Sequence, residues 1–257
     1  MLYSYRHISR QVNACPYTLA APSWVWPGTV AENCVRLAGI FPEVALIFLE
    51  SEPCLGYSGQ DLPPSLAGLP LKYHVHLPVD LDWREPRSAF EVCAALADKV
   101  AFLSPGAYVL HPPAGKAAKR RKLLGEFADM WRHSGHDAGS VLLENTREAG
   151  PDEIAAIARK EGFGLCLDLG HIMAYEQALP ALPDTAGLVR MVHLNAPGPN
   201  AEHLPLTQLG PEGRSTARGL IELCEEDAVL VLEIFEPRGL MESAQLTARW
   251  IEEWNLR

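Results

Sequence analysis

Histidines and carboxylates stand at the ends of six short apolar runs in this sequence. Each run resembles a buried strand and finishes on a side chain that can ligate metal or carry a proton, in chain order His76, His111, Glu144, Asp168, His193 and Glu233. His171 and His203 follow in the loops after two of these runs. Nitrogen and oxygen donors without a thiolate suit Zn, Mn, Co or Fe. We predict that all eight residues bind divalent metal.

The two-residue period of a strand indicates where four of these groups point. Each shares a strand face with a small or apolar residue two positions earlier, in the pairs Leu142–Glu144, Cys166–Asp168, Met191–His193 and Val231–Glu233. If the earlier residues face the inside of a barrel, the polar groups converge over its mouth. An unpaired buried carboxylate is costly, so several carboxylates beside imidazoles favour a bound cation. One such histidine alone would be an ordinary residue, and His74, deeper on the same strand as His76, is expected to pack.

The elements that must position these groups alternate between apolar strands and amphipathic helices. We predict eight strands, over residues 17–20, 44–49, 72–77, 107–111, 140–144, 164–168, 188–194 and 228–235. A helix over 29–41 and a last helix from Leu240 to Trp254 show apolar residues at helical spacing.

Eight strand–helix units in 257 residues average roughly 32 residues each, a typical βα length. Nearly continuous apolar strands indicate parallel pairing beneath helices. The sequence therefore predicts one α/β domain over residues 1–257, a (β/α)8 TIM barrel with its metal site at the C-terminal ends of the strands. An open doubly wound sheet is the alternative, but the chain lacks the glycine-rich phosphate turn of that fold.

Composition narrows the classes of partner. The chain has 22 basic and 32 acidic residues, a formal charge of −10, which speaks against binding nucleic acid. One basic run is interpreted as a solvated helix face, and it comprises Lys116, Lys119, Arg120, Arg121 and Lys122. Six dispersed cysteines indicate free thiols, and no signal peptide or membrane span is recognised. We expect a cytoplasmic protein, and the sequence leaves its oligomeric state open.

Three fragments carry a resemblance to a known superfamily. Leu143–Thr146 (LENT), Leu167–His171 (LDLGH) and His193–Asn195 (HLN) resemble motifs of the xylose-isomerase-like barrels, which include endonuclease IV and many sugar isomerases and epimerases. The resemblance covers essentially the whole chain. It implies that His76, His111 and Glu144 hold one metal, that Glu144 bridges to a second held with Asp168, His193 and Glu233, and that His171 and His203 hold a third. Ala201 replaces an aspartate of endonuclease IV, with Glu202 beside it, so two or three metals per chain are expected.

Further fragments resemble one group within that superfamily. Leu19–Asn33 (LAAPSWVWPGTVAEN), Tyr73–Pro78 (YHVHLP) and Leu110–Pro113 (LHPP) are similar to the cobamide-remodelling phosphodiesterases. Those enzymes open the nucleotide loop of cobalamin-type corrinoids so that the lower ligand can be exchanged. The resemblance implies a small-molecule substrate, a corrinoid. Trp24 and Trp26, with Tyr57 as a weaker candidate, would then offer a flat surface to its rings.

The leading hypothesis is therefore metal-dependent phosphodiester hydrolysis, in which metals polarise the phosphate and activate water. Glu144 and Glu233 would act at the metals, and His203, with Glu202 beside it, would position water or the leaving group. The alternative is a sugar isomerase or epimerase with one metal, whose two glutamates exchange a proton. That reaction needs neither His76 nor His111. An abasic-site endonuclease and a non-catalytic ligand-binding barrel are further hypotheses.

Overall fold

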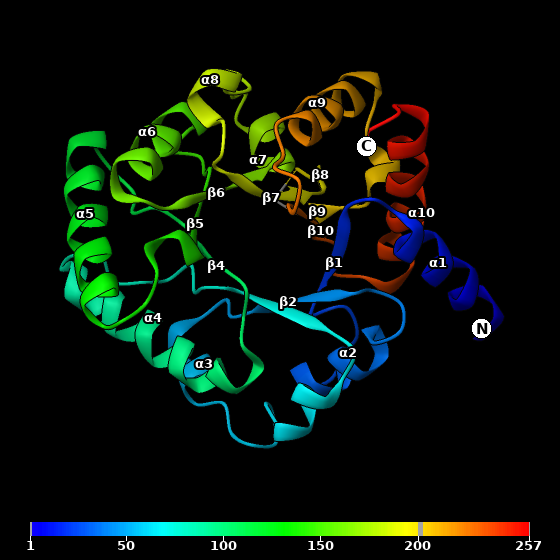
Figure 1. Ribbon diagram of the computed structural model, residues 1–257, viewed down its shortest axis with the longest axis horizontal. Coiled ribbons are helices and arrows are strands. Elements are labelled where there is room, and N and C mark those ends of the chain that lie inside the picture. The colour runs from blue at the N-terminus through cyan, green and yellow to red at the C-terminus, as the bar shows by residue number, and fades with distance from the viewer. Residues whose placement is uncertain (1, 200–202, 257) are drawn as a thin grey trace.

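Eight parallel strands form a closed barrel (Figure 1). The computed structural model describes residues 2–199 and 203–256. Around the barrel the strand order is β1-β10-β7-β6-β5-β4-β3-β2. Their bounds are Thr18–Pro22 (β1), Glu43–Ile47 (β2), Lys72–His76 (β3), Tyr108–Leu110 (β4), Val141–Glu144 (β5), Gly164–Asp168 (β6), Val189–Leu194 (β7) and Val229–Leu232 (β10). The predicted (β/α)8 barrel is confirmed, and each of these eight barrel strands coincides with a predicted strand to within a few residues.

Helices surround the barrel and cover the outer faces of the strands (Figure 1). They are α1 (Leu2–Ala14), α2 (Val30–Leu37), α3 (Ser51–Leu55), α4 (Pro86–Val100), α5 (Ala117–His133), α6 (Pro151–Glu161), α7 (Leu169–Ala174), α8 (Leu182–Thr185), α9 (Pro211–Glu222) and α10 (Pro237–Glu253). In the described part of the chain, none of them combines the length and apolarity that a membrane crossing requires.

Local sequence signals set the ends of α2. Thr29 accepts a hydrogen bond from the backbone N–H of Glu32, whose side chain accepts one from the N–H of Thr29. This capping box satisfies two N–H groups at the helix start. The helix ends at Leu37 because Gly39 has a φ of +82°, which suits glycine but not the continuing helix. The predicted helix over 29–41 is therefore four residues too long at its end.

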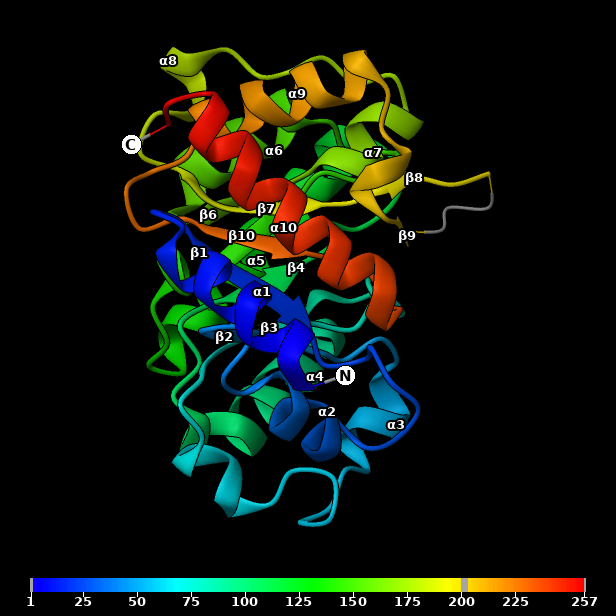
Figure 2. The same ribbon diagram turned by 90° about the vertical axis from the view of Figure 1, so that its right-hand side faces the viewer.

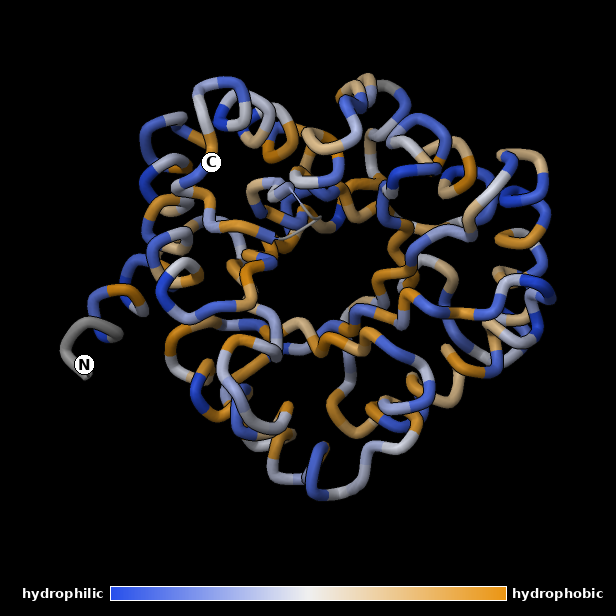
Figure 3. Tube along the Cα trace, turned by 180° about the vertical axis from the view of Figure 1, so that it is seen from behind, coloured by the Kyte–Doolittle hydropathy of each residue, from blue (hydrophilic) through white to orange (hydrophobic). Residues whose placement is uncertain are grey.

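Two apolar layers hold the barrel together. The larger one lies between strands and helices, and the smaller one fills the barrel itself with alternate strand residues, Ala20, Ala45, Ile47, Ala107, Val109, Leu142, Cys166, Met191 and Val231. Hydrophobic colour follows the inner ring of strands in Figure 3. Since Leu142, Cys166, Met191 and Val231 are inside, the residues two positions later on each strand also face inward, at the C-terminal end.

Two elements were not predicted. Helix α1 precedes the barrel and packs against α10, as Figure 2 shows. A small antiparallel hairpin, β8 (Ala196–Pro197) with β9 (His203–Leu204), stands out from one end of the barrel in the same view. The hairpin fixes where His203 lies. Ala201 and Glu202, the two positions on which the expected third metal depends, lie outside the described residues.

Candidate metal centre

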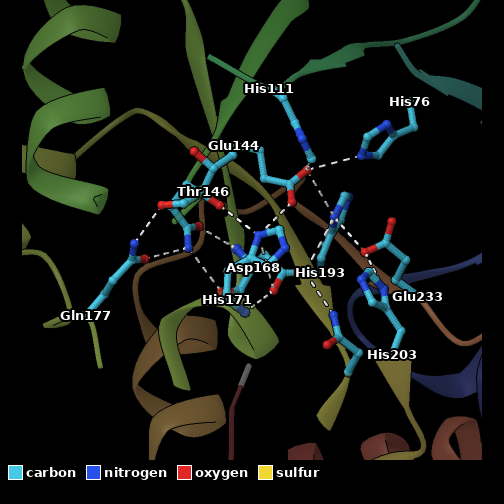
Figure 4. A network of polar contacts seen from close by, with 12 residues as sticks. His76, His111, Glu144, Thr146, Asp168, His171, Gln177, His193, His203 and Glu233 are labelled. Atoms are coloured by element: carbon cyan, nitrogen blue, oxygen red, sulfur yellow. Dashed lines mark hydrogen bonds and ion pairs between the residues drawn. The ribbon is translucent and has the colours of Figure 1, made fainter. Parts of the chain in front are cut away.

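The eight predicted metal ligands gather at the C-terminal mouth of the barrel (Figure 4). His76, Glu144, Asp168 and His193 are on strands, whereas His111 and Glu233 directly follow β4 and β10. We call this set the mouth cluster, and it comprises His76, His111, Glu144, Asp168, His171, His193, His203 and Glu233. The three carboxylates are at least 95% buried in their side chains. A large buried charge therefore has to be balanced within the cluster.

Glu144 is the centre of this arrangement. Its Oε2 atom lies 3.2 Å from His76 Nε2 and 3.3 Å from His111 Nε2. The same oxygen is 3.4 Å from His193 Nδ1, and the other oxygen is 3.2 Å from His171 Nδ1. Figure 4 shows the carboxylate between these imidazoles. One carboxylate thus faces four histidines and is placed to contact more than one cation.

A second group of donors lies around His193 Nδ1. This atom is 3.2 Å from Glu233 Oε2 and 3.8 Å from Asp168 Oδ2. His203 Nδ1 approaches the same Glu233 oxygen at 3.0 Å. Asp168, His193 and Glu233 offer donor atoms that all lie within 4.8 Å of one another. Two further triplets meet the same limit, His76–Glu144–His193 and Glu144–Asp168–His171.

The two histidines expected at a third metal are close but not adjacent. Their ring centroids are 6.2 Å apart, with His171 turned toward Glu144 and His203 turned toward Glu233. His171 Nδ1 is also 2.8 Å from the carbonyl oxygen of Asn145, so this nitrogen is placed to donate there. The structure brings both histidines into the mouth cluster, and a separate third site stays a prediction.

The imidazoles keep two glutamates ionised. Burial alone would raise the pKa of Glu144, but the positive charges of His111 and His193 outweigh burial and hold that pKa well below its usual range. Burial likewise opposes ionisation of Glu233, whose pKa is nevertheless held well below normal by His193 and His203. Both carboxylates are therefore available as ligands or bases at neutral pH.

The carboxylates in turn favour protonated imidazoles when no cation is present. Burial lowers the pKa of His171, but Asp168 and Glu144 more than compensate and raise it to about 10. The pKa of His203 is also raised, since the carboxylate of Glu233 outweighs burial. Protons thus balance the carboxylates in the metal-free fold. A divalent cation would have to displace them, as it does in metal sites generally.

The geometry of the donor atoms in the mouth cluster suits the binding of divalent cations. Five buried cluster atoms find no hydrogen-bond partner among the described residues, namely His111 Nε2, Glu144 Oε2, His193 Nδ1, His203 Nδ1 and Glu233 Oε2. Buried polar atoms without partners are costly, and here they face one another. Donors about 2.1 Å from a tetrahedral ion are separated by about 3.4 Å. The contacts of 3.0–3.4 Å around Glu144 and Glu233 match that separation.

Amide side chains that were not predicted as part of the site hold Asp168 in place. Asn195 Nδ2 donates to Asp168 Oδ2 at 2.8 Å, and the backbone N–H of Asp168 donates to Asn145 Oδ1 at 2.7 Å. Asn145 also donates to Gln177. Gln177 in turn donates to the carbonyl of Thr146, as Figure 4 shows. Asn145 and Asn195 lie within the fragments LENT and HLN, so the sequence resemblance already pointed to the region that supports Asp168. Such outer contacts orient ligands and tune affinity.

Gly170 is part of the same support. A Cβ atom at this position would lie 1.9 Å from Asn195 Oδ1, so no larger residue fits while Asn195 contacts Asp168. The side chain of Asp168 caps α7, because its Oδ1 accepts a hydrogen bond from the backbone N–H of His171 at 2.5 Å. The glycine in LDLGH therefore permits a close approach between the first turn of α7 and Asn195, the residue following β7.

The three predicted substrate-binding residues, Trp24, Trp26 and Tyr57, are not part of the mouth cluster. Trp24 is 46% exposed in the loop after β1. The pKa of Tyr57 is raised mainly by burial. Tyr57 packs its ring on Phe48. Trp26 is half-buried, and the guanidinium of Arg36 lies 5.7 Å from its ring centroid. Trp24 is therefore the only one of the three with a large exposed ring face, and substrate contact stays a prediction.

Two further contacts of buried ionisable side chains lie outside the mouth cluster, one made by His74 and one by Arg120. His74 is buried, as expected, and its Nδ1 lies 2.7 Å from Glu43 Oε1 below the cluster. The interpretation of the whole basic run as a solvated face is wrong for Arg120, which is only 1% exposed. Its guanidinium donates to the carbonyls of Pro113 and Gly115, both at 2.7 Å, and pairs with Glu153 at 2.7 Å. These partners offset the burial of the charge, and they pin the loop after β4.

Comparison with known proteins gives matches in structure alone. No family model matches the chain, and no curated protein matches it in sequence. Among solved structures, a D-tagatose 3-epimerase-like protein superposes with a TM-score of 0.72 at 17% identity, covering 93% of this chain and 98% of its own. Endonuclease IV from Thermus thermophilus gives 0.67 at 19% identity, covering 92% and 99%. D-psicose 3-epimerase from Clostridium cellulolyticum, solved with D-tagatose, gives 0.64 at 12% identity, covering 93% and 99%.

These likenesses establish the fold. It is the barrel found in xylose-isomerase-like proteins and endonuclease IV, as the sequence fragments implied. Sugar epimerases and endonuclease IV both occur among the matched structures. The narrower resemblance to cobamide-remodelling enzymes gains no support from these comparisons.

Proposed function

We propose that this chain is a metal-dependent enzyme whose reaction takes place at the mouth cluster. The observation that carries the proposal is the convergence of the buried donor atoms of Glu144, Asp168, His193 and Glu233, which face one another. Three of these four residues hold an atom that finds no hydrogen-bond partner in residues 2–199 and 203–256. A divalent cation held there would supply positive charge that polarises substrate oxygen atoms. The protein's own residues would bind the substrate, exclude water and move protons.

For the reaction, we infer a sugar isomerase or epimerase as the first candidate. Glu144 and Glu233 come from β5 and the end of β10, strands separated in the barrel by β6 and β7. Both reach His193 Nδ1, at 3.4 and 3.2 Å, so the two carboxylates flank a common centre. Their lowered pKa values keep both in the basic form. One can remove a proton from a carbon next to a carbonyl while the other serves the opposite side. The epimerases among the structural matches support this candidate.

A second candidate, phosphodiester hydrolysis, is favoured by one specific observation. His76 and His111 contact Glu144 Oε2, at 3.2 and 3.3 Å, and neither is needed for a single four-donor site. Together with Glu144 they form the donor set of a further cation. Two cations sharing a carboxylate would balance the charge of a phosphodiester and of its leaving oxygen. His203, held 3.0 Å from Glu233, could then position water at the substrate. Endonuclease IV among the matches is consistent with this candidate.

The corrinoid is the narrowest form of the second candidate. It rests on the sequence fragments around Trp24 and on the exposure of that ring beside Tyr57. Flat apolar ring systems gain by stacking on exposed aromatic faces. Release of the lower-ligand nucleoside or nucleotide from adenosylcobalamin would support it, and no release under conditions where another phosphodiester is cleaved would exclude it.

Counting metals separates the two reactions. The wild-type protein and His111→Ala are reconstituted in turn with Zn, Mn, Co and Fe(II), and bound metal is measured per chain. One equivalent, unaffected by His111→Ala, with interconversion of D-psicose, D-tagatose and D-fructose, supports the first candidate. Two or more equivalents, partly lost in His111→Ala, with cleavage of bis(p-nitrophenyl) phosphate, support the second. His133→Ala is the control, because His133 is exposed on α5, away from the mouth cluster. No bound metal would contradict both.

A further inference from the structure

A cavity opens beside the mouth cluster where three barrel loops meet. It has a volume of about 490 Å³ and is lined by residues of the loops after β3, β4 and β5. His111 belongs to both the cavity wall and the mouth cluster, and a quarter of its side chain is exposed. Apolar side chains form much of the rest, among them Leu81, Trp83 and Pro113. A cavity of this size can receive part of a small-molecule substrate next to the candidate metals.

Some charged residues that line this cavity have a hydrogen-bonded partner, and others do not. Arg84 and Asp82 neutralise each other, with Nη2–Oδ2 at 2.6 Å and Nε–Oδ1 at 2.9 Å. Glu148 accepts a hydrogen bond from the backbone N–H of Gly115. Lys119 and Arg147 line the same cavity, yet neither has an ion pair or a side-chain hydrogen bond within residues 2–199 and 203–256. Two free cations stand at the wall of a cavity in a chain whose formal charge is −10.

Arg147 also links this cavity to a second one. The second cavity, about 660 Å³, is lined by Arg147, Tyr175 and residues 197–199, among others. Tyr175 stacks on His171 with ring centroids 5.5 Å apart, and His171 is 6.0 Å from His111. Arg147 therefore lies between two hollows that border the cluster at His111 and near His171. A group bound to Arg147 would lie beside the donors and not among them.

The first turn of α5, which carries Lys119 at the cavity wall, is fixed to the loop after β4. Arg120 donates to the carbonyls of Pro113 and Gly115, and these two residues bracket the turn between β4 and α5. Since Arg120 is buried and paired with Glu153, its neighbour Lys119 starts from a rigid backbone. A preformed wall lowers the entropic cost of binding a ligand.

We propose that Lys119 and Arg147 hold a phosphate group of the substrate in the cavity beside His111, apart from the atoms that react at the mouth cluster. The inference rests on the proposed function, because it assigns part of the substrate of that site. Arginine offers a planar pair of donors for phosphate oxygens, and lysine adds a mobile positive charge. The apolar wall suits the carbon skeleton that joins the phosphate to the reacting group. The substrate class is thus a phosphorylated compound, such as a sugar phosphate, in preference to a neutral sugar.

Binding of inorganic phosphate and of D-fructose 6-phosphate to the zinc-loaded protein tests the proposal by isothermal titration calorimetry. The variant is Lys119→Ala with Arg147→Ala. The matched control is Arg121→Ala with Lys122→Ala, which removes the same charge from the same region without touching the cavity. We expect the first variant to weaken both affinities at least about tenfold, the loss of roughly one charge-assisted contact, and the control to change them less than about twofold.

Three results would overturn the proposal. They are no binding of either probe to the wild-type protein, unchanged affinity in the Lys119/Arg147 variant, and an equal loss in both double variants, which would indicate a general effect of charge. Bound zinc and circular dichroism verify that each variant is folded and loaded. The measurement is independent of turnover, so failure to convert any sugar or phosphodiester would count against the proposed function and leave this result standing.

Discussion

Asn195 offers a specific test of the support around Asp168. Its Nδ2 atom donates to Asp168 Oδ2 at 2.8 Å, and both side chains are almost completely buried. Asn195→Ala removes this donor and introduces no clash, because the nearest constraint, Gly170, faces the deleted amide. Asp168 keeps its hydrogen bond from the N–H of His171 but can rotate. We expect the fold to persist and metal binding to weaken.

The magnitude follows from the type of contact. A hydrogen bond to a charged group contributes about 1.5–3 kcal/mol. At 1.4 kcal/mol per factor of ten, its loss corresponds to roughly a 10- to 150-fold weaker metal affinity if the carboxylate must be reoriented on binding. Removing outer contacts of metal ligands generally has an effect of about 10- to 100-fold. Asn195→Ala should therefore raise the Kd for Zn²⁺ by one to two orders of magnitude.

Competition with a chelator of known affinity measures this change. Asn33→Ala is the control, because Asn33 is an equally buried asparagine that accepts from the N–H groups of Val25 and Trp26 and has no contact with the mouth cluster. Both variants should lose stability in urea, but only Asn195→Ala should lose metal affinity. A folded Asn195→Ala protein that binds Zn²⁺ within twofold of wild type would refute the role given to Asn195.

Four other perturbations have expected outcomes. Chelation should lower Tm by about 5–10 °C in calorimetry, because a ligand at 100 times its Kd contributes about 2.7 kcal/mol and a chain of this size shifts about 2–4 °C per kcal/mol. In metal-free protein, the pKa of His171 is raised from 6.5 to about 10, so its protonated form stabilises the fold fully below pH 6.5, and this stabilisation is lost as the pH rises through 10. The free energy of unfolding in urea should follow this trend. Zinc affinity should instead rise with pH, because zinc binding displaces the proton. A pH-independent zinc affinity would contradict the latter. Arg120→Ala should cost about 2–3 kcal/mol in urea unfolding, since the buried carbonyl of Pro113, the carbonyl of Gly115 and Glu153 lose their partner. A change below about 0.5 kcal/mol would be inconsistent with these contacts. If the chain turns over a corrinoid, Trp24→Ala should raise the KM for it much more than it lowers bound metal, and an unchanged KM would remove Trp24 from the substrate surface.

Much of the fold was accessible from sequence because its determinants are local. Continuous apolar strands such as Val44–Ile47 and the alternation of Leu142 with Glu144 are read directly from residue types, and the barrel brings them together as expected. Helix α1 was missed because it precedes the first strand and belongs to no βα unit. The β8–β9 hairpin has only two residues in each strand, too few to give a pattern.

The candidate site was predictable in its donors but not in its support. Strand-end position identified His76, Glu144 and the other donors, since parallel strands place those ends together. Asn195 and Gly170 act through contacts between neighbouring strands, which no local pattern reveals. The burial of Arg120 was not predicted, because an arginine in a basic run has the same residue type whether its guanidinium is exposed or buried. Only the carbonyls of Pro113 and Gly115, which fold back over α5, distinguish the two.

Anomalous scattering from crystals grown with zinc tests the central claim most directly. Data collected on both sides of the zinc edge locate each bound ion without reference to any reaction. We predict a peak among Asp168, His193 and Glu233, with donor distances of about 2.0–2.2 Å, and Glu144 in contact with the same ion. Zinc found only at surface residues, with these side chains still paired to one another, would contradict the account.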